Sequence, residues 1–123
     1  MLSAGAVVEK DGRFLMIRDT ARGRLVLPGG HLHWNESPQA GAQREVREET
    51  GHEIAVGRLI GAYGFDSGLS ERGIIRLMYE ATIVGGSEQP SAEGTVEWVT
   101  LDDLEADGSK EAFIIRDSPL KPV

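Results

Sequence analysis

A segment in the middle of the chain, residues 37–51, carries a complete set of helix start and stop signals. The hydroxyl of Ser37 can cap a helix N-terminus, and Pro38 is a residue type favoured at the first helical position. Gly51 is the residue type that commonly ends a helix in the left-handed conformation. The segment therefore predicts a helix over residues 37–50, and the rest of the chain must fold around it.

Short runs rich in apolar and β-branched residues on both sides of this helix predict strands. The expected strands cover residues 3–8, 13–18, 24–27, 54–64, 74–84 and 95–100, and loops are expected over 31–36 and 66–73. A second, short helix begins at Leu101, and residues 113–115 are expected to dock the C-terminal tail. We therefore expect an α+β fold, an α/β/α sandwich in which a mixed β-sheet packs with one long helix and one short helix.

The composition is that of one ordinary globular domain over residues 1–123, with 40% hydrophobic and 27% charged residues. The absence of cysteine excludes disulfides, zinc–thiolate sites and thiol catalysis. A net charge of −7 argues against a nucleic-acid coat and against binding to an anionic membrane. No window approaches the roughly 20 apolar residues of a membrane span, and no signal peptide is recognised. We expect a cytoplasmic location.

Three glutamates of the predicted helix share one face. Glu45, Glu48 and Glu49 fall within an arc of roughly 100°. Like charges at these spacings destabilise a helix by roughly 0.2–0.5 kcal/mol per pair, which Arg44 and Arg47 partly offset. The face is either a solvated charged surface or a set of carboxylates that holds a hard divalent cation, which prefers oxygen ligands. Helix geometry alone does not decide between these two interpretations.

The remaining faces of the helix are assigned by the same periodicity. Ala42 and Val46 lie to one side of the acidic arc and form the expected buried stripe. Gly41 lies under the arc, one turn before Glu45, where the missing side chain allows another group to approach closely.

The residues around this helix resemble the Nudix box. From Gly30, five residues lead to Glu36, and seven more precede the run Arg44-Glu45-Val46-Arg47-Glu48-Glu49-Thr50-Gly51. The departure is at the last position, where His52 replaces a bulky apolar residue. Two further stretches resemble the lead-in and the closing elements of the family: Leu27-Pro28-Gly29-Gly30 and Glu97 to Leu104. The chain is thus identified as a member of the Nudix (MutT-like) hydrolase family, which implies the Nudix fold.

The resemblance implies hydrolysis of a pyrophosphate bond in a nucleoside diphosphate linked to another group. Glu45, Glu48 and Glu49 match the metal-ligand positions of the family, and a backbone carbonyl of Gly29 or Gly30 would complete the site. The expected metal is Mg²⁺, with Mn²⁺ as a substitute. The resemblance therefore favours the cation site over the solvated surface. It also implies that homodimers are frequent among relatives, so a homodimer is one expectation.

Other catalytic roles are carried over in the same way. Arg44 matches a position that orients the glutamates, and Glu36 matches a loop glutamate that supports the site. The general base of the family is sometimes a glutamate of the box and sometimes an acid on a later loop. The later candidate here is Glu93, with Glu97 behind it. Both also fit a simpler interpretation as solvated charges.

The substrate is less well defined by the sequence. The candidate substrate contacts are cationic and aromatic residues, each with an alternative surface or packing role: Arg18, Arg24, His33, Trp34 and Arg76. Trp34, for example, either stacks on a base or packs half-buried. The expected substrate is a small nucleotide, a nucleoside triphosphate cleaved to monophosphate and pyrophosphate. The alternatives are a sugar nucleotide or ADP-ribose-type substrate, or a nucleotide-binding module without catalysis.

The acidic residues are unevenly distributed along the chain. Residues 86–123 hold 3 basic and 9 acidic residues, whereas residues 1–36 hold 5 basic and 4 acidic residues. The first third, around Gly29 and Gly30, is therefore the part expected to meet phosphates. A bound divalent cation would supply the positive charge that the glutamate face lacks.

Overall fold

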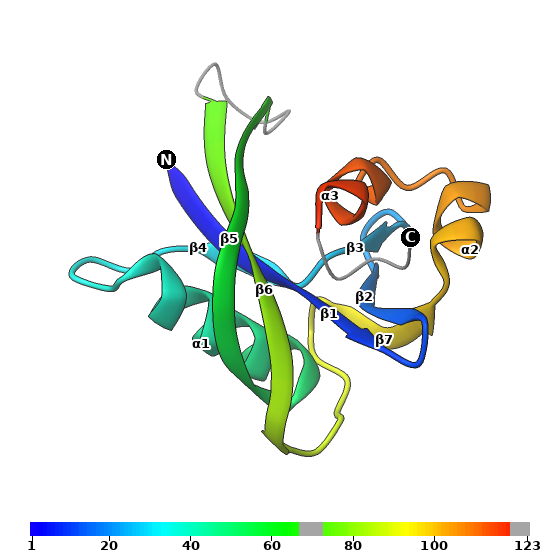
Figure 1. Ribbon diagram of the computed structural model, residues 1–123, viewed down its shortest axis with the longest axis horizontal. Helices are drawn as coiled ribbons and strands as arrows, with labels where there is room; N and C mark the ends of the chain where they lie inside the picture. The colour runs from blue at the N-terminus through cyan, green and yellow to red at the C-terminus, as the bar shows by residue number, and fades with distance from the viewer. Residues whose placement is uncertain (67–72, 119–123) are drawn as a thin grey trace.

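The computed structural model describes residues 1–66 and 73–118 (Figure 1). Most of the loop expected over 66–73 lies outside the described residues. The strands are β1 (Leu2–Lys10), β2 (Arg13–Asp19), β3 (Leu25–Val26), β4 (Gly29–His31), β5 (His52–Asp66), β6 (Gly73–Gly86) and β7 (Gly94–Val99). The helices are α1 (Pro38–Thr50), α2 (Leu101–Ala106) and α3 (Ala112–Asp117). The expected α+β sandwich with a mixed sheet is confirmed.

The sheet is organised around β1. The strand order is β3-β2-β1-β6-β5, with β4 also paired to β1 and β7 paired to β2. β1 runs parallel to β6 from Leu2, opposite Ile75, to Val8, opposite Ala81, and its last two residues pair with β2 in an antiparallel hairpin. Because one strand belongs to both halves of the sheet, β1 fixes the position of β4 relative to the rest.

Alternation along β1 and β2 sends side chains to two opposite cores. Val7 packs in a cluster with Phe14 of β2 and with buried residues of α2 and α3. Val8 packs instead in a cluster with Leu15 of β2 and with Val46 of α1. Figure 1 shows α1 and the α2–α3 pair on opposite sides of β1. The period-2 pattern of the strands therefore builds the two helical layers of the sandwich.

The long helix has the predicted ends. The Ser37 hydroxyl accepts a hydrogen bond from the Ala40 amide at 3.1 Å, and Gly51 ends the helix at φ 82°. Ala42 and Val46 are fully buried, which confirms the expected stripe. At Gly41 the group that approaches closely is the Leu32 side chain of the preceding loop, because an added Cβ would overlap it.

Two elements differ from the sequence prediction. Residues 29–31, which lie outside every expected strand, form the strand β4, because glycines at 29 and 30 let the backbone lie against β1. An added Cβ at Gly29 would lie 2.6 Å from the Ala4 carbonyl oxygen. The tail expected only to dock forms α3, because Ile114 and Ile115 are buried against the sheet while Phe113 stays 48% exposed. None of the described helices is long and apolar enough to cross a membrane.

Candidate functional site

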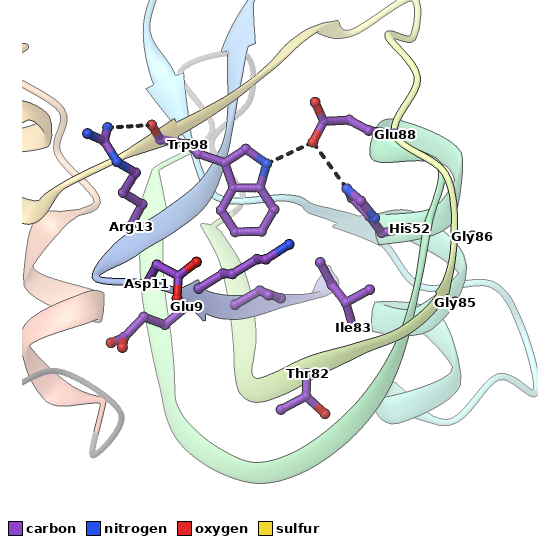
Figure 2. A pocket seen from close by; sticks show the side chains of 12 residues that line it. Glu9, Asp11, Arg13, His52, Thr82, Ile83, Gly85, Gly86, Glu88 and Trp98 are labelled. Carbon is purple, nitrogen blue, oxygen red and sulfur yellow. Dashed lines mark hydrogen bonds and ion pairs between the residues drawn. The ribbon is translucent and has the colours of Figure 1, made fainter.

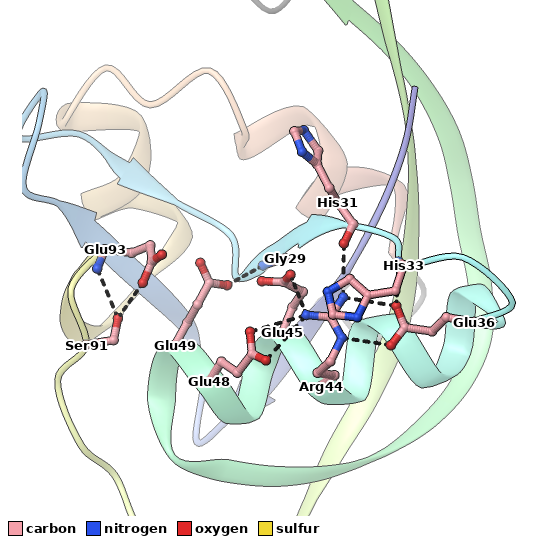
Figure 3. Close-up of polar contacts among 10 residues, drawn as sticks. All are labelled: Gly29, His31, His33, Glu36, Arg44, Glu45, Glu48, Glu49, Ser91 and Glu93. Carbon is pink, nitrogen blue, oxygen red and sulfur yellow. Dashed lines mark hydrogen bonds and ion pairs between the residues drawn. The ribbon is translucent and has the colours of Figure 1, made fainter.

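Arg44 lies at the centre of the polar contacts on the acidic face of α1 (Figure 3). Its Nε and Nη2 atoms donate to the two carboxylate oxygens of Glu36 at 2.7 and 3.0 Å. Its Nη1 donates to Glu45 at 2.9 Å and to Glu48 at 3.2 Å, and Nη2 also donates to the His31 carbonyl at 3.0 Å. A planar guanidinium with five donors suits such a junction. Arg44 thus joins the carboxylates of Glu36, Glu45 and Glu48.

Glu36 ties the loop before α1 to this junction. Besides the paired bonds from Arg44, its Oε1 accepts the backbone amide of His33 at 3.0 Å. The hydrogen bonds from Arg44 and, to a smaller extent, from the His33 amide together lower the pKa of Glu36 to about 2. The carboxylate is therefore charged at physiological pH and remains paired with Arg44.

Glu49 has a different environment. It is only 7% exposed, and its Oε1 accepts the backbone amide of Gly29 at 2.7 Å. Burial and, to a smaller extent, the negative charges of Glu45 and Glu93 raise the pKa of Glu49 to about 8, against the opposing effects of the Gly29 amide and Arg76. The negative charges on this face of α1 are therefore not fully balanced by positive charges of the neighbouring residues.

The glycine lead-in contacts the glutamates directly. An added Cβ at Gly30 would lie 2.6 Å from the Glu45 carboxyl, so any larger residue would displace that side chain. Gly29 contacts Glu49 through its amide. Both glycines predicted from the sequence therefore lie against the acidic face.

Glu93 and Glu97, the two acids of the later segment, have different roles. Figure 3 shows Glu93 on the loop before β7, across from Glu49, where its carboxylate accepts a hydrogen bond from Ser91 at 3.2 Å. Glu97 is bonded to Arg18 at 2.9 Å, and the bonds from Arg18 lower the pKa of Glu97. Glu93 alone of these two faces the glutamates of α1.

The donor set fits a hard divalent cation in its chemistry. Glu45, Glu48 and Glu49 offer only carboxylate oxygens, which Mg²⁺ and Ca²⁺ prefer. Among the described residues, however, no group of three or more His, Cys, Asp or Glu side chains is arranged to hold a metal ion. Glu45 and Glu48 are instead bonded to Arg44, and Glu49 to Gly29. A cation at this face therefore requires rearrangement of these side chains.

Comparison with known proteins decides the family. The NUDIX domain model matches residues 1–117. The chain is 41% identical over 114 residues to a MutT-like protein of Streptomyces ambofaciens, covering 92% of this chain and 71% of the relative. The chain belongs to the Nudix family. It is also 27% identical over 88 residues to an ADP-ribose pyrophosphatase of Methanocaldococcus jannaschii, covering 69% of this chain and 52% of that protein.

Solved structures agree with this assignment. The fold matches a NUDIX hydrolase from Nitrosomonas europaea with a TM-score of 0.81 and 25% identity, over 94% of this chain and 84% of the other. The protein is therefore a Nudix hydrolase. Enzymes of this family generally use divalent metal ions and act on small nucleotides.

A cavity of about 460 Å³ lies between β3, β5, β6 and the start of α3 in this Nudix hydrolase. Its charged lining is mainly cationic: Arg22, Arg24, Arg76 and Lys110, with Asp19 and Glu111. Tyr63 and Phe113, whose rings meet edge to face at 5.3 Å, form its aromatic wall. Sequence reasoning named Arg24 and Arg76 but missed Lys110, Glu111 and Phe113. The available signal was the apolar run at 113–115 within an acidic tail.

The other predicted substrate contacts lie elsewhere. Arg18 bonds to Glu97, Asp107 and the Gly23 carbonyl, and so joins β2 to β7 and the end of α2. Trp34 is 96% exposed on the loop before α1, so the half-buried packing alternative is wrong. His33 is on the same loop, exposed, with its backbone amide bonded to Glu36.

A larger cavity, of about 740 Å³, lies beside His52, just after the C-terminal end of α1, and is lined by none of the predicted site residues (Figure 2). His52, the residue that departs from the Nudix pattern, is part of its wall. Its ring meets Trp98 edge to face, and both rings bond to Glu88, at 3.1 Å from His52 and 2.7 Å from Trp98. The departure is therefore accommodated by local packing and hydrogen bonds.

Proposed function

We propose that this Nudix hydrolase is a Mg²⁺-dependent pyrophosphohydrolase that cleaves a nucleoside triphosphate to a monophosphate and pyrophosphate. The observation that carries the proposal is the acidic face of α1 next to a cationic cavity. Arg76 connects the two regions, because it lines the cavity and its charge acts on Glu49. A polyanionic substrate in the cavity would thus present its phosphates toward the glutamates.

In this proposal Glu45, Glu48 and Glu49 hold the cation, with a carbonyl of Gly29 or Gly30 as a further ligand. Bound Mg²⁺ would neutralise the pyrophosphate and lower the pKa of a bound water. Mn²⁺ would substitute, because it accepts the same oxygen ligands. The uncompensated negative charge around the buried Glu49 supports this assignment, since a cation would stabilise it.

The remaining residues of the site position the carboxylates or take a proton from the attacking water. Arg44 and Glu36 hold the carboxylates of the helix and the preceding loop in one orientation. Glu93 is our candidate for the general base that takes the proton of the attacking water. This assignment is supported by the position of Glu93 across from Glu49, on a loop in which Ser91 donates a hydrogen bond to the Glu93 carboxylate.

The cavity supports the choice of a nucleotide. Phe113 and Tyr63 offer an aromatic wall for a base, and a base that stacks on such a ring gains roughly 1–3 kcal/mol. Arg22, Arg24 and Lys110 add positive charge around a polyphosphate.

A sugar nucleotide or an ADP-ribose-type compound is the second candidate substrate. It is favoured by the similarity to the archaeal protein named as an ADP-ribose pyrophosphatase. Parallel assays of nucleoside triphosphates, ADP-ribose and nucleoside diphosphate sugars distinguish the two candidates by kcat/KM. A higher kcat/KM for the diphosphate compounds would replace the triphosphate assignment.

The direct test measures release of monophosphate and pyrophosphate with and without Mg²⁺, for the wild type and for Glu48→Gln. We expect turnover only with the cation and a large loss in the variant. Glu53→Gln, which changes an exposed glutamate of β5, is the matched control and should keep wild-type activity. Equal turnover in wild type and Glu48→Gln would contradict the proposal. Tight nucleotide binding without turnover would indicate a binding module instead.

A further inference from the structure

Both backbone polar groups of Leu27 are held by one buried ion pair. The Leu27 amide donates to Glu111 Oε1 at 2.7 Å, and Arg76 Nη2 donates to the Leu27 carbonyl at 3.1 Å. Arg76 Nη1 bonds to the same Glu111 oxygen at 2.9 Å. The two side chains are only 11% and 17% exposed. Charge-assisted hydrogen bonds of low exposure fix a backbone segment more firmly than neutral, solvated ones.

Glu111 is itself fixed by the turn that leads into α3. The Ser109 hydroxyl accepts the Glu111 amide at 3.2 Å and donates to the Leu25 carbonyl at 2.8 Å. The turn at residues 109–111 therefore contacts the chain at Leu25 and again at Leu27. Segments more than 80 residues apart in the sequence are joined here.

The opposite side of the lead-in is held by β1. The Pro28 carbonyl accepts the Ala6 amide at 3.2 Å, and Gly29 pairs with Gly5. Residues 27–29 are thus enclosed between β1 and the Arg76–Glu111 pair. The next group along the chain is the Gly29 amide, which donates to Glu49 at 2.7 Å.

We infer that Glu111 is a positioning residue that, together with Arg76, sets the Gly29 amide on Glu49 through the backbone of Leu27. The inference rests on the proposed function for the role of Glu49 as a cation ligand. It does not place Glu111 on the substrate's reacting atoms. Because Arg76 and Glu111 also line the cationic cavity, the pair couples the cavity to the acidic face of α1.

The test uses three variants of the full chain. Glu111→Ala removes both bonds, whereas Glu111→Gln keeps an oxygen that accepts the Leu27 amide and loses only the charge. Glu105→Ala is the matched control, because it removes an ion pair to Arg116 between α2 and α3 without contact to Leu27. Thermal unfolding establishes that each variant is folded. For each we measure the chemical shift and hydrogen exchange of the Gly29 amide by NMR, without metal or substrate.

We expect Glu111→Ala to shift the Gly29 amide signal and to speed its exchange, with Glu111→Gln in between and Glu105→Ala unchanged. In activity assays, the Mg²⁺ concentration for half-maximal rate should rise roughly tenfold in Glu111→Ala. A Gly29 amide that is unaltered in folded Glu111→Ala or Glu111→Gln overturns the inference. The NMR result does not depend on turnover, so a wild type inactive on nucleotides would overturn the proposed function alone.

Discussion

The acidic face of α1 and the cationic cavity are built in different ways. Every contact of the acidic face described above, apart from Glu93, joins residues between Gly29 and Glu49, within 21 positions of the sequence. The cavity collects its lining from residues 19–26, 63–64, 76 and 110–114. A local arrangement can be recognised from spacing, whereas a cavity of distant segments appears only after folding. In our proposal, the common chemistry of the family resides in the first region and the substrate choice in the second.

The two regions also differ in charge. On the acidic face Arg44 bonds to Glu45, Glu48 and the loop residue Glu36, whereas Glu49 is buried without a cationic bond among the described contacts. The cavity has four basic and two acidic residues, with Arg76 paired to Glu111. One region therefore attracts cations and the other attracts anions. Variants should change kcat when they alter the first and KM when they alter the second.

The largest effect is expected for Glu49→Gln. The substitution keeps the shape and an acceptor for the Gly29 amide but removes the negative charge. Because a cation contributes several kcal/mol of charge stabilisation, kcat should fall by roughly 100-fold or more. Steady-state kinetics at saturating Mg²⁺ measure this. A variant that loses only affinity for the nucleotide would show that the two regions are not separate.

The next effect is expected for Arg44→Lys. A lysine keeps the charge but cannot bond both Glu36 oxygens and reach Glu45 at once. Removal of a group that orients metal ligands typically lowers metal affinity or activity by 10–100-fold. We therefore expect kcat/KM to fall by roughly tenfold or more. Arg47→Lys, an exposed position on the same helix, is the control. Equal kinetics for both variants would contradict the central role of Arg44.

A smaller effect, confined to KM, is expected for Phe113→Ala. Loss of a stacking ring costs roughly 1–3 kcal/mol, so KM should rise at least about fivefold while kcat stays close to wild type. Trp34→Ala, which removes the exposed tryptophan of the loop, is the comparison. If Trp34→Ala raises KM and Phe113→Ala does not, the base contacts the loop and not the cavity.

A separate prediction concerns stability against pH in protein kept free of divalent cations. Burial raises the pKa of Glu49 to about 8, so the folded state holds this proton more tightly than the unfolded state. Stability should therefore fall as the pH rises from about 4.5 to 8. Glu49→Gln should remove that decrease. The stability of wild type and of Glu49→Gln is measured by thermal unfolding in the presence of a chelator, from acid pH to pH 9.

Glu36 provides the control of opposite sign in the same experiment. Its bonds to Arg44 lower its pKa to about 2, so its contribution is complete above pH 4.5 and is lost as the pH falls toward 2. Glu36→Gln should flatten the acidic side of the curve and leave the side above pH 4.5 parallel to wild type. A Glu49→Gln curve that still decreases toward pH 8 would assign the decrease to another group.

Much of the site followed from the sequence because its determinants are local. Ser37, Pro38 and Gly51 define the helix by capping and backbone preference alone, and the 3.6-residue period places Glu45, Glu48 and Glu49 on one face. The structure brings Gly29, Gly30, Glu36 and Arg44, which the resemblance to the family singled out, to that face. Whether these residues bind Mg²⁺ stays a prediction that the assays above address.

The elements that sequence reasoning missed depend on distant partners. The strand β4 forms because glycine backbones at 29 and 30 fit against β1, and α3 forms because Ile114 and Ile115 find an apolar surface on the sheet. A helix of six residues has little intrinsic stability, since nucleation is unfavourable, and α3 also lacks the side-chain cap that Thr100 provides for α2. The formation of β4 and α3 therefore depends on tertiary packing, and the sequence contains only a weak pattern for either element.

The sequence by itself determined the family, the long helix and the face that carries its glutamates, because backbone preference and side-chain periodicity act over a few residues. Only the tertiary structure decided that Arg18 joins β2 to β7 and that Trp34 is exposed. It also decided that Glu111 holds Leu27 from the other end of the chain. Hydrogen bonds between residues 80 positions apart depend on the closure of the whole fold, which no local pattern encodes.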